Sequence, residues 1–295
     1  MAHSHRWLLD DLEQRHQLFL KRMDKKQYLY PIRRYHTICY VPGNTLPPRP
    51  YAALELPEGV AFCQEDTAKV AAMLRSLASR CAREDTHQFP GGPETYVAGH
   101  VGQEKRTPLR FSYLPLPTIG HEHGDGMIRR LLIAEPFDGD GRHARWAQGR
   151  LRNATLRDED GHDRGILMDF WRSTSRTVVE RYVNPARAWT TVTPVILPGF
   201  DDGKHAKAER LFSAALRQAD MPVTAVKDVT LRKAPFWPGS QHPRQYFLPD
   251  YLRRGLSKGL LGWHVRLVFH EEVPGPLAIG AGRHAGLGIF AASEE

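Results

Sequence analysis

Residues 110–134 read RFSYLPLPTIGHEHGDGMIRRLLIA, two apolar runs joined by a polar turn that contains three glycines. The runs at 110–116 and 127–134 predict two strands that the turn at 120–126 connects. Upstream, residues 51–56 predict a short strand, and residues 65–82 predict a helix with Val70, Leu74 and Leu77 on its buried face. Strand, helix, strand, turn and strand form the opening of a ferredoxin-like (RRM-like, βαββαβ) unit.

The same order of elements recurs later in the chain. Residues 142–152 predict the second helix of the first unit, and residues 166–171 its closing strand. Downstream, we expect strands at 189–197, 223–231, 263–269 and 287–291, and a helix at 204–219. The expected fold is therefore α+β, with tandem ferredoxin-like units at 51–185 and 186–295. Residues 1–50 hold a helix at 7–23 and a linker rich in proline.

Five glycines lie within the fourteen positions 275–288, in GPLAIGAGRHAGLG, so we expect positive φ angles or close backbone approach there. Such a loop can bring its main-chain amides to an anion. It lacks the Gly-Lys-Ser/Thr ending of a P-loop, and no βαβ unit follows it, as a dinucleotide fingerprint requires. A polymeric phosphate backbone is therefore a better candidate than a mononucleotide.

The bulk properties are those of a soluble globular protein, and the positive net charge favours a polyanionic partner, although such a charge is also a common solubility feature. The 295 residues are 41% hydrophobic and 25% charged, with a net charge of +8. The three cysteines, Cys39, Cys63 and Cys81, form no metal-binding pattern and fit a reducing compartment. The sequence shows neither a membrane span nor the apolar core of a signal peptide, so we expect a cytoplasmic protein.

Three motifs resemble a known family. PLPTIGHEHGDGMIRRLLIAEP, AWTTVTPVILP and WHVRLVFHEEVPGPLAIGAGRHAGLGIF occur in the same order in the RAMP superfamily of CRISPR systems, in the type I-G (I-U) subunit. That subunit fuses a backbone-capping half to a repeat-processing endoribonuclease half. The resemblance covers roughly 50–291, and residues 7–40 look like the tail of a truncated capping half. Ala281 and Ala285 stand where the family's motif leads us to expect aromatic residues.

The resemblance implies cleavage of precursor CRISPR RNA within each repeat, with no metal or other cofactor. The substrate's 2′-hydroxyl attacks the adjacent phosphate and leaves a 2′,3′-cyclic phosphate and a 5′-hydroxyl. Expected partners are CRISPR repeat RNA, crRNA and other subunits of a type I effector (Cascade) complex, and no membrane. The protein must deprotonate one hydroxyl, protonate one leaving oxygen and stabilise the phosphorane. Histidine suits the proton transfers and arginine or lysine the charge.

His100 is the first catalytic candidate, because related endoribonucleases commonly carry a catalytic histidine after the first helix. The alternative is an ordinary exposed loop histidine. His121 and His123 are the second candidates, as an acid–base pair that Asp125 orients. For them the alternatives are a structural turn, in which Asp125 makes local hydrogen bonds, and a metal-dependent phosphodiesterase.

The RNA-binding candidates are basic residues and the glycine-rich loop. Arg283 is the best phosphate-clamping candidate, because a guanidinium binds phosphate through two hydrogen bonds. A subunit that binds RNA without cutting it is the alternative to the endoribonuclease. The full set of RNA-binding candidates is Lys105, Arg106, Arg129, Gly280, Gly282, Arg283, His284, Gly286 and Gly288.

Overall fold

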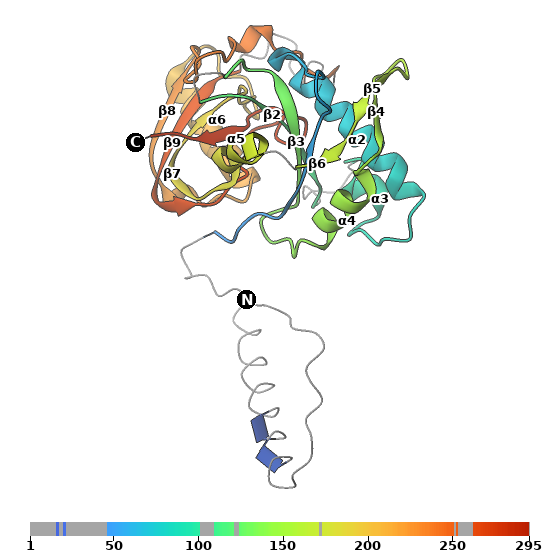
Figure 1. Ribbon diagram of the computed structural model, residues 1–295. Coiled ribbons are helices and arrows are strands. Elements are labelled where there is room, and N and C mark those ends of the chain that lie inside the picture. The colour runs from blue at the N-terminus through green and yellow to red at the C-terminus, as the bar shows by residue number, and fades with distance from the viewer. Residues whose placement is uncertain are drawn as a thin grey trace. The chain divides into compact units, whose positions relative to one another are not determined.

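The computed structural model describes residues 46–100, 109–120, 124–170, 173–250, 252 and 262–294, together with 16–17 and 20–21. The chain divides into two units, Met1–Tyr40 and Val41–Glu295. The four described residues of the first unit are helical and fall within the helix expected at 7–23. Both sheets described below belong to the second unit (Figure 1).

The first sheet has the strand order β2-β3-β1-β6, and each neighbouring pair is antiparallel. This is the ferredoxin-like order, in which a helix follows the first strand and another follows the third. The elements are β1 (Tyr51–Glu55), α2 (Thr67–Arg83), β2 (Ser112–Pro117), β3 (Ile128–Ala134), α4 (Arg142–Leu151) and β6 (Met168–Asp169). Shorter pieces are η1 (Gln64–Asp66), α3 (Pro93–Tyr96), and a hairpin of β4 (Thr155–Arg157) and β5 (Asp163–Ile166).

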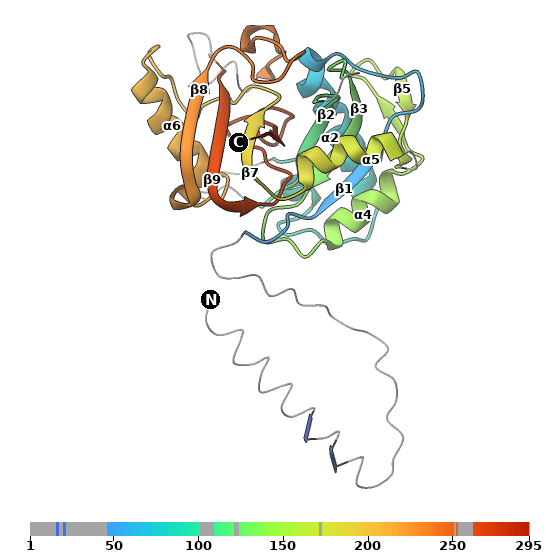
Figure 2. The same ribbon diagram turned by 60° about the vertical axis from the view of Figure 1, so that its left-hand side comes forward.

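Both faces of the first sheet are buried, because side chains alternate along its strands. On β3, Leu131 and Ile133 face the core formed with α2 and α4. Leu132 and Ala134 face a second core, which contains residues of α5 (Ser173–Val183) and of the C-terminal segment, such as Ile289. The first sheet therefore lies between its own helices and the second half of the chain (Figure 2).

The second sheet repeats the strand order as β10-β7-β9-β8, again with antiparallel neighbours. Phe212 and Leu216 of α6 share one hydrophobic core with Leu267 of the third strand, because apolar residues recur on one face of the helix. The elements are β7 (Ala186–Thr191), α6 (His205–Gln218), η2 (Val223–Ala225), β8 (Val226–Arg232), η3 (Pro243–Gln245), β9 (His264–Val273) and β10 (Phe290–Ala292).

The tandem ferredoxin-like prediction is confirmed, with one difference in the second ferredoxin-like half, the one that contains β7 to β10. Within residues 262–294, no helix lies between β9 and β10; the glycine-rich loop occupies that place. This loop joins the two halves, since Ala285 pairs with Tyr113 of β2 and the amide of Ala281 donates to Ile196 O. None of the helices in the described part of the chain is long and apolar enough to span a membrane.

Candidate functional site

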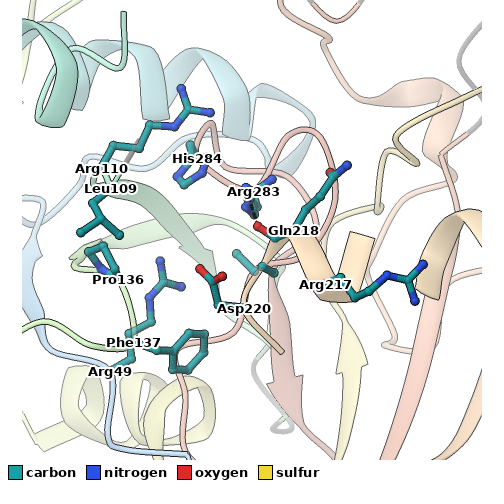
Figure 3. Close-up of a pocket in the computed structure, with 12 residues that line it drawn as sticks. Arg49, Leu109, Arg110, Pro136, Phe137, Arg217, Gln218, Asp220, Arg283 and His284 are labelled. Carbon is teal, nitrogen blue, oxygen red and sulfur yellow. Dashed lines mark hydrogen bonds between the residues drawn. The ribbon is translucent and has the colours of Figure 1, made fainter. Parts of the chain in front are cut away.

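A cavity of about 500 Å³ lies where the two ferredoxin-like halves of the unit Val41–Glu295 meet. Most of the charged residues that line the cavity are arginines. Its walls come from the segment before β1, the residues just before β2, the turn after β3, the end of α6 and the glycine-rich loop. In Figure 3, Arg49 and Asp220 extend toward the middle of the cavity, whereas the side chain of Arg217 points away from it. Other lining residues include Arg110, Pro136, Phe137, Arg283 and His284.

Arg49 is buried at the floor of this cavity, with 7% of its surface exposed. Its Nε donates to Glu135 O, its Nη1 to Pro276 O at 3.1 Å, and its Nη2 to Ser112 Oγ at 2.7 Å. These acceptors belong to three separate segments, so one side chain ties the linker before β1 to both halves. The same hydrogen bonds fix the orientation of the guanidinium.

Arg283 is the second buried arginine, with 9% of its surface exposed. Its Nη1 donates to Gly280 O at 3.2 Å, and its Nη2 donates to Gln218 O at 2.7 Å. The side chain therefore reaches from the glycine-rich loop to a carbonyl at the C-terminal end of α6, which carries partial negative charge. This arginine, predicted to clamp phosphate, is held in place by the protein's own carbonyls.

The two buried arginines make the cavity strongly positive. Burial is the main cause that lowers the pKa of each from 12.5 to about 10, and Arg283 further lowers the pKa of Arg49 by repulsion. Asp220 acts on both in the opposite direction. Both guanidiniums therefore stay charged at neutral pH, and each carries a desolvation cost that a nearby anion would reduce.

His284 lies beside the arginines with its protonation state fixed by its neighbours. Nδ1 is 3.1 Å from Phe111 O and 3.0 Å from Ser112 Oγ. A carbonyl oxygen can only accept, so Nδ1 carries the proton and Nε2 does not. Burial, with Arg110, Arg283 and Arg49 nearby, lowers the pKa of His284 well below its usual value. Among the described residues, the buried Nε2 has no hydrogen-bond partner.

His100 is exposed and lies in the segment that leads toward this cavity. Its Nδ1 is 3.1 Å from Glu94 Oε2, and Glu94 also accepts from Arg83 at 2.8 Å. The preceding residue, Gly99, accepts from Arg110 Nη1 at 3.1 Å, and Arg110 lines the cavity. A carboxylate at Nδ1 leaves Nε2 as the nitrogen that can accept a proton, as in hydrolytic triads.

In the His-x-His-x-Asp turn, the carboxylate of Asp125 contacts Arg129 and a main-chain amide, whereas we expected it to orient a histidine. Asp125 accepts from Arg129 through both oxygens, at 2.9 and 2.7 Å, and from the amide of Met127 at 3.0 Å. These local hydrogen bonds are those that the structural-turn alternative predicts. They also engage the guanidinium that we expected to contact RNA at position 129. His121 and His123 lie outside the described residues, as do Lys105 and Arg106.

The glycines of the C-terminal loop pack closely against other parts of the protein, whereas we expected their close approach to be to an anion. A Cβ at Gly280 would lie 2.6 Å from Ile196 O, and one at Gly286 would lie 2.8 Å from Thr67 O. Gly282 and Gly288 are equally enclosed, by Leu287 and by Ile279. Several amides of the loop donate to carbonyls of the chain: those of Ile279, Ala281, Arg283, Ala285, Leu287 and Gly288. The glycines permit this packing, and their assignment to RNA binding stays a prediction.

Sequence reasoning missed several residues of the cavity because they lie far apart in the chain. Arg49 lies within a run of prolines that we treated as a boundary, and Arg110 and Asp220 look like ordinary surface charges. A contact between the buried His143 and the partly buried His87 was missed too: His87 Nε2 lies 2.9 Å from His143 Nδ1. No spacing signal links these positions, so only the fold reveals them.

One group of possible metal ligands occurs among the described residues. Ligand atoms of Asp158, Asp160 and His162 lie within 4.8 Å of one another in the β4–β5 turn. Asp158 Oδ1 also accepts from the amides of Asp160 and His162, at 3.1 and 2.9 Å. These bonds account for the grouping as a turn.

Comparison with known proteins adds one strong match. The family model described as "CRISPR-associated protein, GSU0054 family" matches residues 5–292. Among solved structures, one described as a Cas6 product complex is 16% identical and covers 83% of this chain and 99% of that chain, with a TM-score of 0.37. None of the curated proteins compared with this chain matches it.

Proposed function

Since this chain belongs to the GSU0054 family of CRISPR-associated proteins, we propose that it binds CRISPR repeat RNA and cleaves it as an endoribonuclease. The observation that carries the proposal is the cavity in which Arg49 and Arg283 stay charged although both are buried. RNA presents one negative charge per nucleotide, and protein cations release its counterions on binding. A fixed cluster of guanidiniums also stabilises charge that develops on a phosphate during cleavage.

We assign His100 as the general base of a metal-independent reaction. Glu94 holds Nδ1–H, which leaves Nε2 free to take the proton of an RNA 2′-hydroxyl. The resulting 2′-oxygen attacks the adjacent phosphorus, the bond to the 5′-oxygen breaks, and a 2′,3′-cyclic phosphate forms. His121 and His123 are the proposed sources of the proton that the leaving 5′-oxygen takes up.

The resemblance of the sequence motifs supports a more specific role. We propose that the chain corresponds to the repeat-processing half of a type I-G subunit, acts in the cytoplasm and joins other effector subunits. Lys105, Arg106 and Arg129 then contact RNA around the cut, and Arg129 must exchange its contact with Asp125 for a phosphate.

The test uses a CRISPR repeat RNA labelled at its 5′ end, from an array encoded beside this gene, in buffer with EDTA. We expect one cut within the repeat, a product that ends in a 2′,3′-cyclic phosphate, and no cut when the nucleotide at that position is 2′-deoxy. Activity that EDTA abolishes and Mn²⁺ restores would contradict the metal-independent mechanism. Binding without any product would contradict cleavage.

A non-catalytic RNA-binding subunit is the second candidate. It is favoured by the exposure of His100, whose side chain is 74% accessible, since catalytic bases are more often enclosed. Under this alternative the cavity binds RNA, the wild-type protein forms no product, and His100→Ala leaves RNA affinity unchanged.

A further inference from the structure

The buried arginines of the cavity lack the partner that buried charges normally have. Arg49 and Arg283 bond only to carbonyls and one hydroxyl, and within the described residues neither forms an ion pair with a carboxylate. Leaving a charge buried without a counterion is costly, and proteins keep such charges paired. Among the described residues only Asp220 acts on both arginines as a negative charge, and it forms no ion pair with either, so the cavity can take an anion from outside the chain.

The hydrogen bonds already made define what that anion can be. A guanidinium has five N–H groups, and each of these two arginines uses only some of them on protein acceptors. The bonds to main-chain carbonyls hold the remaining N–H groups in place before a ligand arrives, so little entropy is lost on binding. Guanidiniums in fixed positions match the several oxygens of a tetrahedral phosphate.

The cavity also has an apolar wall beside its charged floor. Leu109, Pro136 and Phe137 line one part of it, and the guanidinium of Arg49 lies 5.2 Å from the centre of the Phe137 ring. A volume of about 500 Å³ falls within the range of sites that hold small organic ligands, so it has room for more than an inorganic ion. An aromatic ring beside phosphate-binding groups is suited to a base or a sugar.

We propose that this cavity binds one nucleotide through its phosphate group, with Arg49, Arg110 and Arg283 around the phosphate and Leu109, Pro136 and Phe137 against the attached nucleoside. The inference rests on the proposed function only in naming RNA as a source of that nucleotide. A free nucleotide carries the same chemistry. Because the lining residues come from both halves of the unit, the bound phosphate also bridges those halves.

Substitution of Asp220 tests the proposal, because it should strengthen ligand binding where most substitutions in a binding site weaken it. Its carboxylate faces the cavity and is the negative group that acts on both buried arginines (Figure 3). It therefore competes with a phosphate, and Asp220→Asn should tighten binding, whereas a substitution that merely damages the site weakens it. Asparagine tolerates the residue's φ of +57°. The matched control is Asp202→Asn, whose φ is +55° and whose partner is Lys207.

The experiment measures binding of adenosine 5′-monophosphate, adenosine and inorganic phosphate by calorimetry, at constant ionic strength set with NaCl. We expect the monophosphate to bind and adenosine not to bind. Asp220→Asn should lower the Kd roughly three- to ten-fold, Arg110→Gln should raise it by about ten-fold or more, and Asp202→Asn should leave it unchanged. The melting temperature should rise with the monophosphate in each variant that binds it.

Two outcomes would overturn the inference: no binding of the monophosphate or phosphate to wild type and Asp220→Asn, or weaker binding by Asp220→Asn. A six-nucleotide oligouridylate then distinguishes the two sources. If it displaces the monophosphate, the pocket binds RNA; if it does not, the ligand is a free nucleotide. These measurements need no cleavage, so an inactive protein that passes them refutes the endoribonuclease and leaves the nucleotide site standing.

Discussion

Replacing Gly286 by alanine separates the two reasons a glycine can be required in the C-terminal loop. Its φ is +79°, and an added Cβ would lie 2.8 Å from Thr67 O and 3.1 Å from Ala71 Cβ. The positive φ costs about 1–2 kcal/mol for an L-residue. The clash with the first turn of α2 adds roughly 1–3 kcal/mol, because a backbone oxygen cannot move aside as a side chain can. We expect Gly286→Ala to lower the free energy of unfolding by about 2–5 kcal/mol.

Gly239→Ala is the matched control, since Gly239 has a φ of +83° and nothing within 4 Å of an added Cβ. It should lose only about 1–2 kcal/mol. Urea unfolding followed by tryptophan fluorescence measures both variants. Equal losses at the two positions would refute the conclusion that the loop's glycines serve internal packing. If Gly286→Ala lowers RNA affinity and is no less stable than Gly239→Ala, the result would support the expectation that the glycines let the main chain approach RNA.

Other substitutions test the catalytic assignment, the buried His143 and the helix α4. His100→Ala should slow repeat cleavage more than ten-fold with RNA affinity retained, and Glu94→Gln should slow cleavage less. Single-turnover assays measure both rates. A rate for His100→Ala within ten-fold of wild type contradicts the assignment. Burial, Arg142 and His87 lower the pKa of His143 from 6.5 to about 4. Between these values the unfolded chain binds a proton that the native chain does not, so unfolding free energy should fall as pH drops from 6.5 to 4, and His143→Gln should flatten that slope in urea titrations. Gly149→Ala, inside α4 with nothing within 4 Å, should raise stability by roughly 0.5–1 kcal/mol in the same assay.

The sequence predicted the elements of both sheets wherever periodicity was strong. The helix expected at 65–82 is α2 (Thr67–Arg83), and the helix expected at 204–219 is α6 (His205–Gln218). In contrast, α5 was missed, because its Thr177-Val178-Val179 run favours strands while its buried residues recur at helical spacing. The closing strand expected at 166–171 is only β6 (Met168–Asp169), which pairs with the last two residues of β1.

The candidate site was far less predictable than the fold. Arg283 could be singled out because it interrupts a glycine-rich run, yet its counterpart Arg49 lies 234 positions earlier in a proline-rich linker. Charge repulsion between two side chains depends on distance in space, and the sequence holds no periodic signal for that distance. The glycines illustrate a related limit: close backbone approach is readable from composition, but the identity of the approaching group is not.

The covering of β2 by the C-terminal loop has a consequence for synthesis. All six residues of β2 are buried, and at its outer edge the amide of Tyr113 lies 3.4 Å from His284 O. During translation at roughly 5–20 residues per second, that edge waits on the order of ten seconds for its cover to leave the ribosome. Until then the nascent first half presents an uncovered strand edge, the kind of surface on which other chains can pair.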